Sequence, residues 1–282
     1  MAEKANPIAV DTMSKELWRS HLAMRRLDNQ CAPLRQYLSP GLDVLDVGCG
    51  PGSITVDVAA AVKPGHVCGV DLSQDSIRQA TELAAASGAE HVTFAVGDGA
   101  TLQFADGSFE LVYSNSLLEW VREPEALLRE QRRVARSGGW VIAITNSHAG
   151  RAFYPRCPAL EKILAASLAL AERGRQGVYF NTICSRQTVG MFKAVGFQTL
   201  QVQAYGAPID CVYAGSEFFE YRYESFLKMF ADPDHPTVRY GITDGLYDEG
   251  TVRQAKCDID RWHEDPAAFY LQCRLLVAGR CE

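Results

Sequence analysis

The stretch LDVLDVGCGPG, residues 42–52, decides the fold. Its apolar first half, Leu42 to Val47, predicts a short buried strand that ends at the glycines. Glycine has no Cβ, so the backbone can turn tightly there and a ligand can lie against it. We therefore expect a ligand-binding turn directly after the first strand of a sheet.

Strands and helices alternate outward from this turn, as far as residue 146. Apolar runs predict further strands at residues 67–70, 92–96, 109–113 and 140–145, and helical patterns cover residues 53–62, 73–88 and 124–135. An alternation about every 20–30 residues is typical of a parallel, doubly wound α/β sheet. Ligands of such sheets bind at the carboxyl ends of the strands, so we expect the chemistry just after each strand.

The pattern is looser on either side of this core. Residues 11–38 read as helical with a break near Pro33. Beyond residue 146, helical patterns cover residues 159–172, 185–195, 217–230 and 251–264, strands are predicted at 197–204 and 269–278, and residues 232–250 have little periodicity. Because no linker composition separates the two halves, we expect the extra helices to form a lid on the same domain.

Composition argues against several classes of protein. The 282 residues are 47% hydrophobic and carry a net charge of −6; nucleic acid is a poor main partner because proteins that bind it usually have a basic face. No apolar run approaches the roughly 18 residues of a membrane span, and no secretory signal precedes the core. Nine cysteines, without C-x-x-C or zinc-finger spacing, predict a reduced, cytoplasmic protein without a metal site. The composition leaves open whether the chain forms a homodimer.

The glycine turn itself discriminates between ligands. A dinucleotide fingerprint needs G-x-G-x-x-G, but Ser53 stands at its third glycine and Pro51 has no N–H to offer a phosphate. Asp46 lies just before the turn, where it would repel a pyrophosphate and attract a cation. The turn favours a ligand with a positive centre and no phosphate, although a nicotinamide-dependent oxidoreductase remains the alternative.

Two more carboxylates follow strands. Asp71 ends the second strand, where it could accept hydrogen bonds from both hydroxyls of a ribose; its alternative role is to cap the next helix. Asp98 and Gly99 follow the third strand, where the carboxylate could accept from an adenine amine and a backbone N–H could meet a ring nitrogen. Alone, this pair is only a turn.

Four blocks in order resemble the class I S-adenosylmethionine-dependent methyltransferases of the UbiE-like group. They read LDVLDVGCGPGSIT (42–55), GVDLSQDSI (69–77), VTFAVGDGATLQFADGSFELVYSNSLLEWV (92–121) and EALLREQRRVARSGGWVIAIT (125–145). Arg25 to Leu38 and Phe153 to Pro155 are similar to stretches of a subgroup that includes gliotoxin-type thiomethyltransferases. Four blocks at family spacing are far more specific than one glycine turn.

The resemblance implies a Rossmann-like, seven-stranded sheet whose last strand, 269–278, is antiparallel between the fifth and sixth. It implies three parts: N-terminal helices covering the cofactor (1–40), an S-adenosylmethionine-binding core (41–146), and the rest of the sheet with a helical substrate lid (147–282, the lid at about 147–184 and 207–266). The cofactor would be S-adenosyl-L-methionine and the product S-adenosyl-L-homocysteine.

The resemblance also assigns cofactor residues. The methionine part would contact Gly48, Gly50, Gly52 and the backbone of Ser114, with its ammonium near Asp46; the ribose would meet Asp71 and Leu72, and the adenine Asp98 and Gly99. Arg25 and Asn29 match an Arg/Asn pair of the subgroup. Their i, i+4 spacing would put both on one helix face, from which they could clamp the cofactor carboxylate.

Methyl transfer from a sulfonium is an in-line displacement, so the protein mainly has to align acceptor, methyl and sulfur. A general base that deprotonates the acceptor would add to the rate. His148, after the fifth strand, is the candidate base because its neutral form is available near pH 7. The alternative is a loop histidine exposed to water.

The acceptor is harder to predict. Asn115 stands at a position where many relatives have histidine. Phe153, Tyr154, Phe219 and Tyr223 could form a lid wall over an apolar or aromatic small molecule; alternatively, they pack a helix on the sheet. The sequence thus predicts a small-molecule methyltransferase. A nicotinamide-dependent oxidoreductase and a non-catalytic, cofactor-binding regulator remain the alternatives.

Overall fold

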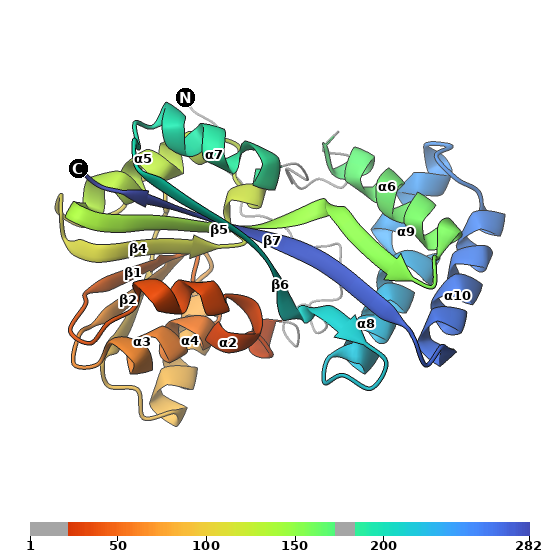
Figure 1. Cartoon of the computed structure of the whole chain (residues 1–282), viewed down its shortest axis with the longest axis horizontal. Helices are drawn as coiled ribbons and strands as arrows, with labels where there is room; N and C mark the ends of the chain where they lie inside the picture. The colour runs from red at the N-terminus through yellow and green to blue at the C-terminus, as the bar shows by residue number, and fades with distance from the viewer. Residues whose placement is uncertain (1–21, 173–183) are drawn as a thin grey trace.

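The structure, a computed structural model, describes residues 22–172 and 184–282 (Figure 1). Parts of the predicted N-terminal helices and of the first predicted lid segment therefore lie outside the described residues. Seven strands form one sheet in the order β3-β2-β1-β4-β5-β7-β6. They are β1 (Val44–Val47), β2 (Val67–Asp71), β3 (Val92–Val96), β4 (Phe109–Asn115), β5 (Ala135–Tyr154), β6 (Leu200–Tyr213) and β7 (Phe269–Arg280).

Strands β1 to β5 run parallel, and β7 lies antiparallel between β5 and β6. This confirms the predicted doubly wound sheet with its last strand antiparallel. The turn after β1 is central in the sheet, because β1 pairs with β2 on one side and with β4 on the other. The carboxyl ends of these three strands consequently meet beside the glycine turn.

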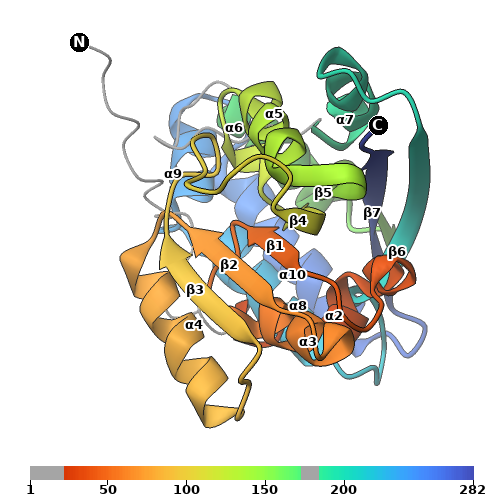
Figure 2. The same cartoon turned by 90° about the vertical axis from the view of Figure 1, so that its left-hand side faces the viewer.

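Helices cover both faces of the sheet (Figure 2). Side chains alternate between faces along a strand: Val141 packs with α5 (Pro124–Val134) and α7 (Cys184–Ala194), whereas Ile142 packs with α2 (Leu27–Gln30), η1 (Ala32–Tyr37) and α3 (Ser53–Val62). Helix α4 (Gln74–Ala86) begins where predicted, because the Ser73 side chain accepts a hydrogen bond from the Ser76 N–H at 3.2 Å. A short 3₁₀ turn, η2 (Leu118–Trp120), follows β4.

The lid has its own apolar core. The helical elements of the lid that build this core are α6 (Pro158–Glu172), α8 (Phe219–Phe226), the π-helical turn η3 (Leu227–Ala231), α9 (Pro236–Thr243) and α10 (Glu249–Glu264). Figure 1 shows these helices grouped at one end of the long ribbons β5, β6 and β7. Asn115, the last residue of β4, pairs with Ile144, so residues 145–154 of β5 extend beyond the carboxyl end of β4 into the lid.

Two strand predictions about this half were wrong, and one helix was not predicted. Strands β5 and β6 are longer than predicted, so both lid segments begin as strands and not as helices. Helix α9 lies in the stretch 232–250, where little periodicity was visible; it begins at a proline behind His235, whose side chain accepts from the Thr237 N–H. Within the described ranges, no helix is long and apolar enough to cross a membrane.

Candidate active site

A pocket opens at the carboxyl ends of β1 and β4. Its lining includes Arg25, Asp46, Gly48, Gly50 and Asn115. The pocket therefore brings together residues from the N-terminal segment, the glycine turn and the end of β4. Parallel sheets of this kind bind their ligands at this edge.

The glycine turn can form only with glycine at key positions. Gly50 has φ +54° and Gly52 has φ +80°, in the left-handed region that disfavours side chains. A Cβ on Gly52 would lie 2.7 Å from the Ala80 Cβ, whereas a Cβ on Gly50 would meet nothing within 4 Å. Gly52 thus lets α3 and α4 pack closely, and the open side of Gly50 gives a ligand access to the backbone.

Asp46 presents a buried carboxylate to this pocket. It is 3% exposed, and its Oδ2 accepts hydrogen bonds from the Thr55 hydroxyl at 2.7 Å and the Tyr113 hydroxyl at 2.6 Å. Burial raises the pKa of Asp46 to about 6, although both hydrogen bonds act in the opposite direction. A cationic ligand group would supply the missing countercharge.

Asp71 connects the glycine turn to the start of α4. Its Oδ2 accepts from the Gly50 N–H at 2.9 Å, and its Oδ1 accepts from the Ser73 N–H at 2.8 Å. A carboxylate has about four acceptor positions, so two remain for a ligand. The side chains of Leu72 and Val96 beside it are 58% and 55% exposed, which leaves apolar surface next to the carboxylate. Sequence reasoning missed Val96, whose signal was its place at the end of the strand beside Asp71.

Asp98 and Gly99 lie in a turn after β3. The Asp98 Oδ1 accepts from the Ala100 N–H at 2.9 Å, and the Asp98 side chain is exposed. A Cβ on Gly99 would lie 2.7 Å from the Val47 Cγ1, so the turn is held close to the end of β1. This residue pair lies at the predicted edge of the sheet and is accessible to a ligand.

The prediction that Arg25 and Asn29 share a helix face was wrong. Helix α2 begins only at Leu27, so Arg25 precedes it and lines the pocket. Asn29 instead completes the start of this helix: its Oδ1 accepts from the Arg26 N–H at 2.8 Å and its amide donates to the Met24 carbonyl at 2.8 Å. Burial and the neighbouring Arg274 lower the pKa of Arg25 to about 10. Arg25 alone is in place to bind an anion.

The end of β4 contributes polar groups. Ser114 is buried within the strand and Asn115 lines the pocket. The next residue, Ser116, has φ +54°, which is rare for a residue other than glycine and often marks a functional position. Its hydroxyl accepts from the Asn146 amide at 3.0 Å and from the Arg274 guanidinium at 3.2 Å. Sequence reasoning missed Ser116 because a positive φ has no signature in a serine.

His148 does not have the geometry of a general base. It lies in an irregular stretch of β5 between Asn146 and Arg151, and its Nδ1 accepts from the Arg151 guanidinium at 2.9 Å and from the Gln272 amide at 3.3 Å. The neutral ring then carries its hydrogen on Nε2, which has no lone pair for a proton. Burial and Arg151 hold the pKa of His148 well below its ordinary value. The lone pair that a general base would need therefore already accepts hydrogen bonds from Arg151 and Gln272.

Three of the four predicted lid-wall residues pack within the lid. Phe153 packs among Phe226, Trp262 and Tyr270 in the lid core. Other rings pack on α10: Phe219 lies 4.7 Å from the Trp262 ring and Tyr223 stacks on His263 at 3.9 Å. Tyr154 is 60% exposed. The packing interpretation thus accounts for Phe153, Phe219 and Tyr223, because the lid needs an apolar core of its own.

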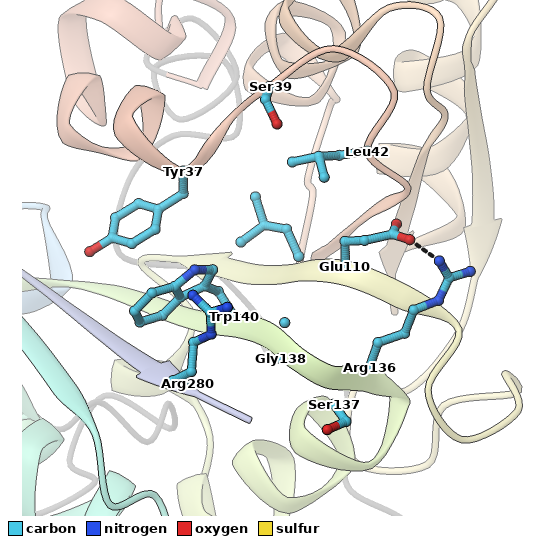
Figure 3. Close-up of a pocket in the computed structure, with 11 residues that line it drawn as sticks. Tyr37, Ser39, Leu42, Glu110, Arg136, Ser137, Gly138, Trp140 and Arg280 are labelled. Atoms are coloured by element: carbon cyan, nitrogen blue, oxygen red, sulfur yellow. Dashed lines mark hydrogen bonds and ion pairs between the residues drawn. The ribbon is translucent and has the colours of Figure 1, made fainter. Parts of the chain in front are cut away.

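A second cavity, of about 310 Å³, lies at the opposite edge of the sheet. Figure 3 shows Tyr37, Trp140 and Arg280 on one side of it and the Glu110–Arg136 ion pair on the other. The Arg280 guanidinium lies 5.0 Å from the centre of the Trp140 ring. This cavity is at the amino ends of the parallel strands, away from the glycine turn, so it is not the predicted site.

Known proteins resemble the chain in sequence. Residues 45–143 match the family described as "Methyltransferase domain". Ajmaline N-methyltransferase of Rauvolfia serpentina is 39% identical over 38% of the chain and 36% of its own length. Demethylmenaquinone methyltransferase of Anoxybacillus flavithermus is 28% identical over 64% of the chain and 80% of its own length. The chain spans about a third of the length of ajmaline N-methyltransferase and of two further curated relatives.

Solved structures share the fold. The YcgJ protein of Bacillus subtilis superposes with a TM-score of 0.56 at 17% identity, over 89% of the chain and 97% of its own. Phosphoethanolamine N-methyltransferase 2 of Haemonchus contortus, solved with S-adenosyl-L-methionine, gives 0.52 at 19% identity, over 89% of the chain and 52% of its own. The shared fold therefore extends beyond residues 45–143.

Proposed function

Because residues 45–143 form a class I S-adenosylmethionine-dependent methyltransferase domain, we propose that the protein transfers the methyl group of S-adenosyl-L-methionine to a small-molecule acceptor. One observation carries the proposal: a single pocket has a buried carboxylate, Asp46, and a guanidinium, Arg25, beside the open side of Gly50. The methionyl group of the cofactor carries an ammonium and a carboxylate, so it matches both charges.

The rest of the cofactor fits the same edge. Its ribose diol would take the two remaining acceptor positions of Asp71, and its adenine would lie on the exposed apolar surface of Leu72 and Val96. Asp98 and Gly99 would read the adenine edge. A pyrophosphate would bring negative charge close to Asp46 and gain no N–H from Pro51, so the nicotinamide alternative fits less well.

When bound, the cofactor supplies an activated methyl group on a positively charged sulfur. The protein's part is to orient the acceptor, which can supply up to roughly 7–11 kcal/mol of the barrier. Asn115, at the pocket wall, would face the reacting end. Residues 145–154 of β5 and the lid helices would close over the acceptor and exclude water.

Titration calorimetry tests this function. S-adenosyl-L-homocysteine should bind to the full chain with one site, and NADH should give no saturable heat. The opposite pattern would favour the oxidoreductase. Binding of S-adenosyl-L-homocysteine without methyl transfer to any compound of a metabolite extract would favour a cofactor-binding regulator.

A further inference from the structure

An arginine cluster lies where β5 and β6 bulge on either side of β7. The register of β5 against β7 shifts between Asn146 and Arg151, and that of β6 shifts between Gly206 and Cys211. Arg151, Arg222 of α8 and Arg274 of β7 form the cluster, with Tyr270 between the first two. A bulge changes the direction in which nearby side chains point, and these two bulges lie side by side at the boundary between the core of the sheet and the lid.

The cluster contains more positive than negative charge. Arg222 donates to the Asp210 Oδ1 at 2.9 Å, and Arg274 contacts the Asp210 Oδ2 at 2.6 Å. Among the described residues, Arg151 has no carboxylate within ion-pair distance; it donates instead to the neutral His148 ring. Arg25 and the buried Glu119 carboxylate also interact electrostatically with Arg274. Four guanidinium groups thus face two carboxylates, which leaves an excess of two positive charges in a largely buried place. Such an excess is costly unless an anion compensates it.

Hydrogen-bond donors in the cluster are also unused. The Nε of Arg151 and the Nε of Arg222 are both buried, and within residues 22–172 and 184–282 neither has a hydrogen-bond partner. Arg222 is only 8% exposed. Buried donors of charged groups are normally satisfied, and a guanidinium fork fits a carboxylate in shape and charge. The unused donors and the excess charge point to the same kind of ligand group.

The cluster is continuous with the proposed cofactor pocket. Arg274 donates to the Ser116 hydroxyl at 3.2 Å, and Ser116 directly follows Asn115, which lines the pocket. Arg274 and Asp210 also act electrostatically on Arg25, which lines the pocket. An acceptor bound between cluster and pocket would have one end on the arginines and the other end near the cofactor.

We propose that the methyl acceptor carries a carboxylate, which binds the cluster of Arg151, Arg222 and Arg274. This rests on the proposed function. The carboxylate supplies the missing negative charge and accepts hydrogen bonds from the unused Nε–H groups of Arg151 and Arg222, while Arg151 keeps its hydrogen bond to His148. Arg151 is the specificity-determining residue, because Asp210 already holds the other two guanidinium groups.

Matched acids and amides test the proposal on the full chain. 3-Phenylpropanoate and indole-3-acetate would be compared with their primary amides by ligand-observed NMR, with S-adenosyl-L-homocysteine saturating. Each acid should bind at least about 10-fold more tightly than its amide, since hydrogen bonds to charged groups are the stronger ones. Equal binding of acid and amide, or no detectable binding of either acid, would overturn the proposal.

Two variants assign the effect to Arg151. Arg151→Gln should remove the preference for acids and keep the affinity for S-adenosyl-L-homocysteine, whereas Arg151→Lys should retain part of the preference. The control is Arg156→Gln, since the Arg156 side chain is 76% exposed and paired with Glu161 at the surface; it should behave as the wild type. A preference that survives in Arg151→Gln would remove Arg151 from the site. If the wild type does not bind S-adenosyl-L-homocysteine, this would instead contradict the proposed function.

Discussion

Replacing Asp71 by alanine should weaken cofactor binding far more than it weakens the fold. Both carboxylate oxygens already accept one backbone N–H each, from Gly50 and Ser73. The ribose diol would add two hydrogen bonds to a charged group, each worth about 1.5–3 kcal/mol. Even a combined loss of about 3 kcal/mol corresponds to a roughly 100-fold increase in Kd. The two backbone donors lie near the surface, where water can replace the carboxylate.

Calorimetric titration with S-adenosyl-L-homocysteine measures this change. The control is Asp106→Ala, because the Asp106 side chain is 81% exposed and its ion pair with Arg133 is at the surface; surface pairs contribute little. Asp106→Ala should leave the Kd unchanged. Circular dichroism and thermal unfolding establish that both variants are folded. If folded Asp71→Ala binds within about twofold of the wild type, Asp71 does not hold the ribose.

Three other changes probe the site. Gly52→Ala should lower the free energy of unfolding by about 2–5 kcal/mol, because of its φ of +80° and the contact with Ala80; an unchanged denaturant midpoint would contradict this. The affinity for S-adenosyl-L-homocysteine should fall about 10-fold per pH unit below pH 6, where Asp46 becomes protonated and loses its attraction for an ammonium. In the unliganded protein the contribution of Asp46 to the free energy of unfolding should rise as pH falls from 6 toward 4, because burial makes the folded state take up the proton before the unfolded chain does. The buried His148 and His235, with lowered pKa values, act in the opposite direction, so this contribution is measured as the difference between the wild type and Asp46→Asn in thermal unfolding. Asp46→Asn should also abolish the pH dependence of the affinity in calorimetry. His148→Ala should keep at least about a tenth of the methyl-transfer rate, since the histidine lacks a free lone pair; a loss of about 100-fold or more at unchanged cofactor affinity would restore it as a base.

The core of the fold could be predicted from the sequence because local signals and burial agree there. Helix α3 has the predicted bounds, Ser53–Val62, and α4 begins at its serine cap. The lid was predicted less well. Strands β5 and β6 continue past their apolar segments because β7 pairs with them across two bulges, and such long-range pairing has no local pattern. Aromatic spacing in α8 was visible, but it could not distinguish a lid wall from packing on α10.

The site, like the fold, was predicted where local sequence signals place its residues and missed where tertiary pairing does. Asp46 and Asp71 lie at the carboxyl ends of β1 and β2 and the glycines follow β1 directly, so strand order alone brings them together. Arg25 lies in the pocket through the path of the chain before α2, and Asn29 has a capping role that i, i+4 spacing does not reveal. The arginine cluster draws on β5, α8 and β7. Its members are more than 50 residues apart in sequence and meet only through tertiary pairing.

Incubation of the pure protein with heavy-methyl S-adenosyl-L-methionine and a metabolite extract, read by mass spectrometry, tests the central claim most directly. The account predicts S-adenosyl-L-homocysteine together with a heavy-methyl product, both strongly reduced with Asp71→Ala at a cofactor concentration below the variant's Kd. Unconsumed cofactor, together with no heat on titration with S-adenosyl-L-homocysteine, would contradict it.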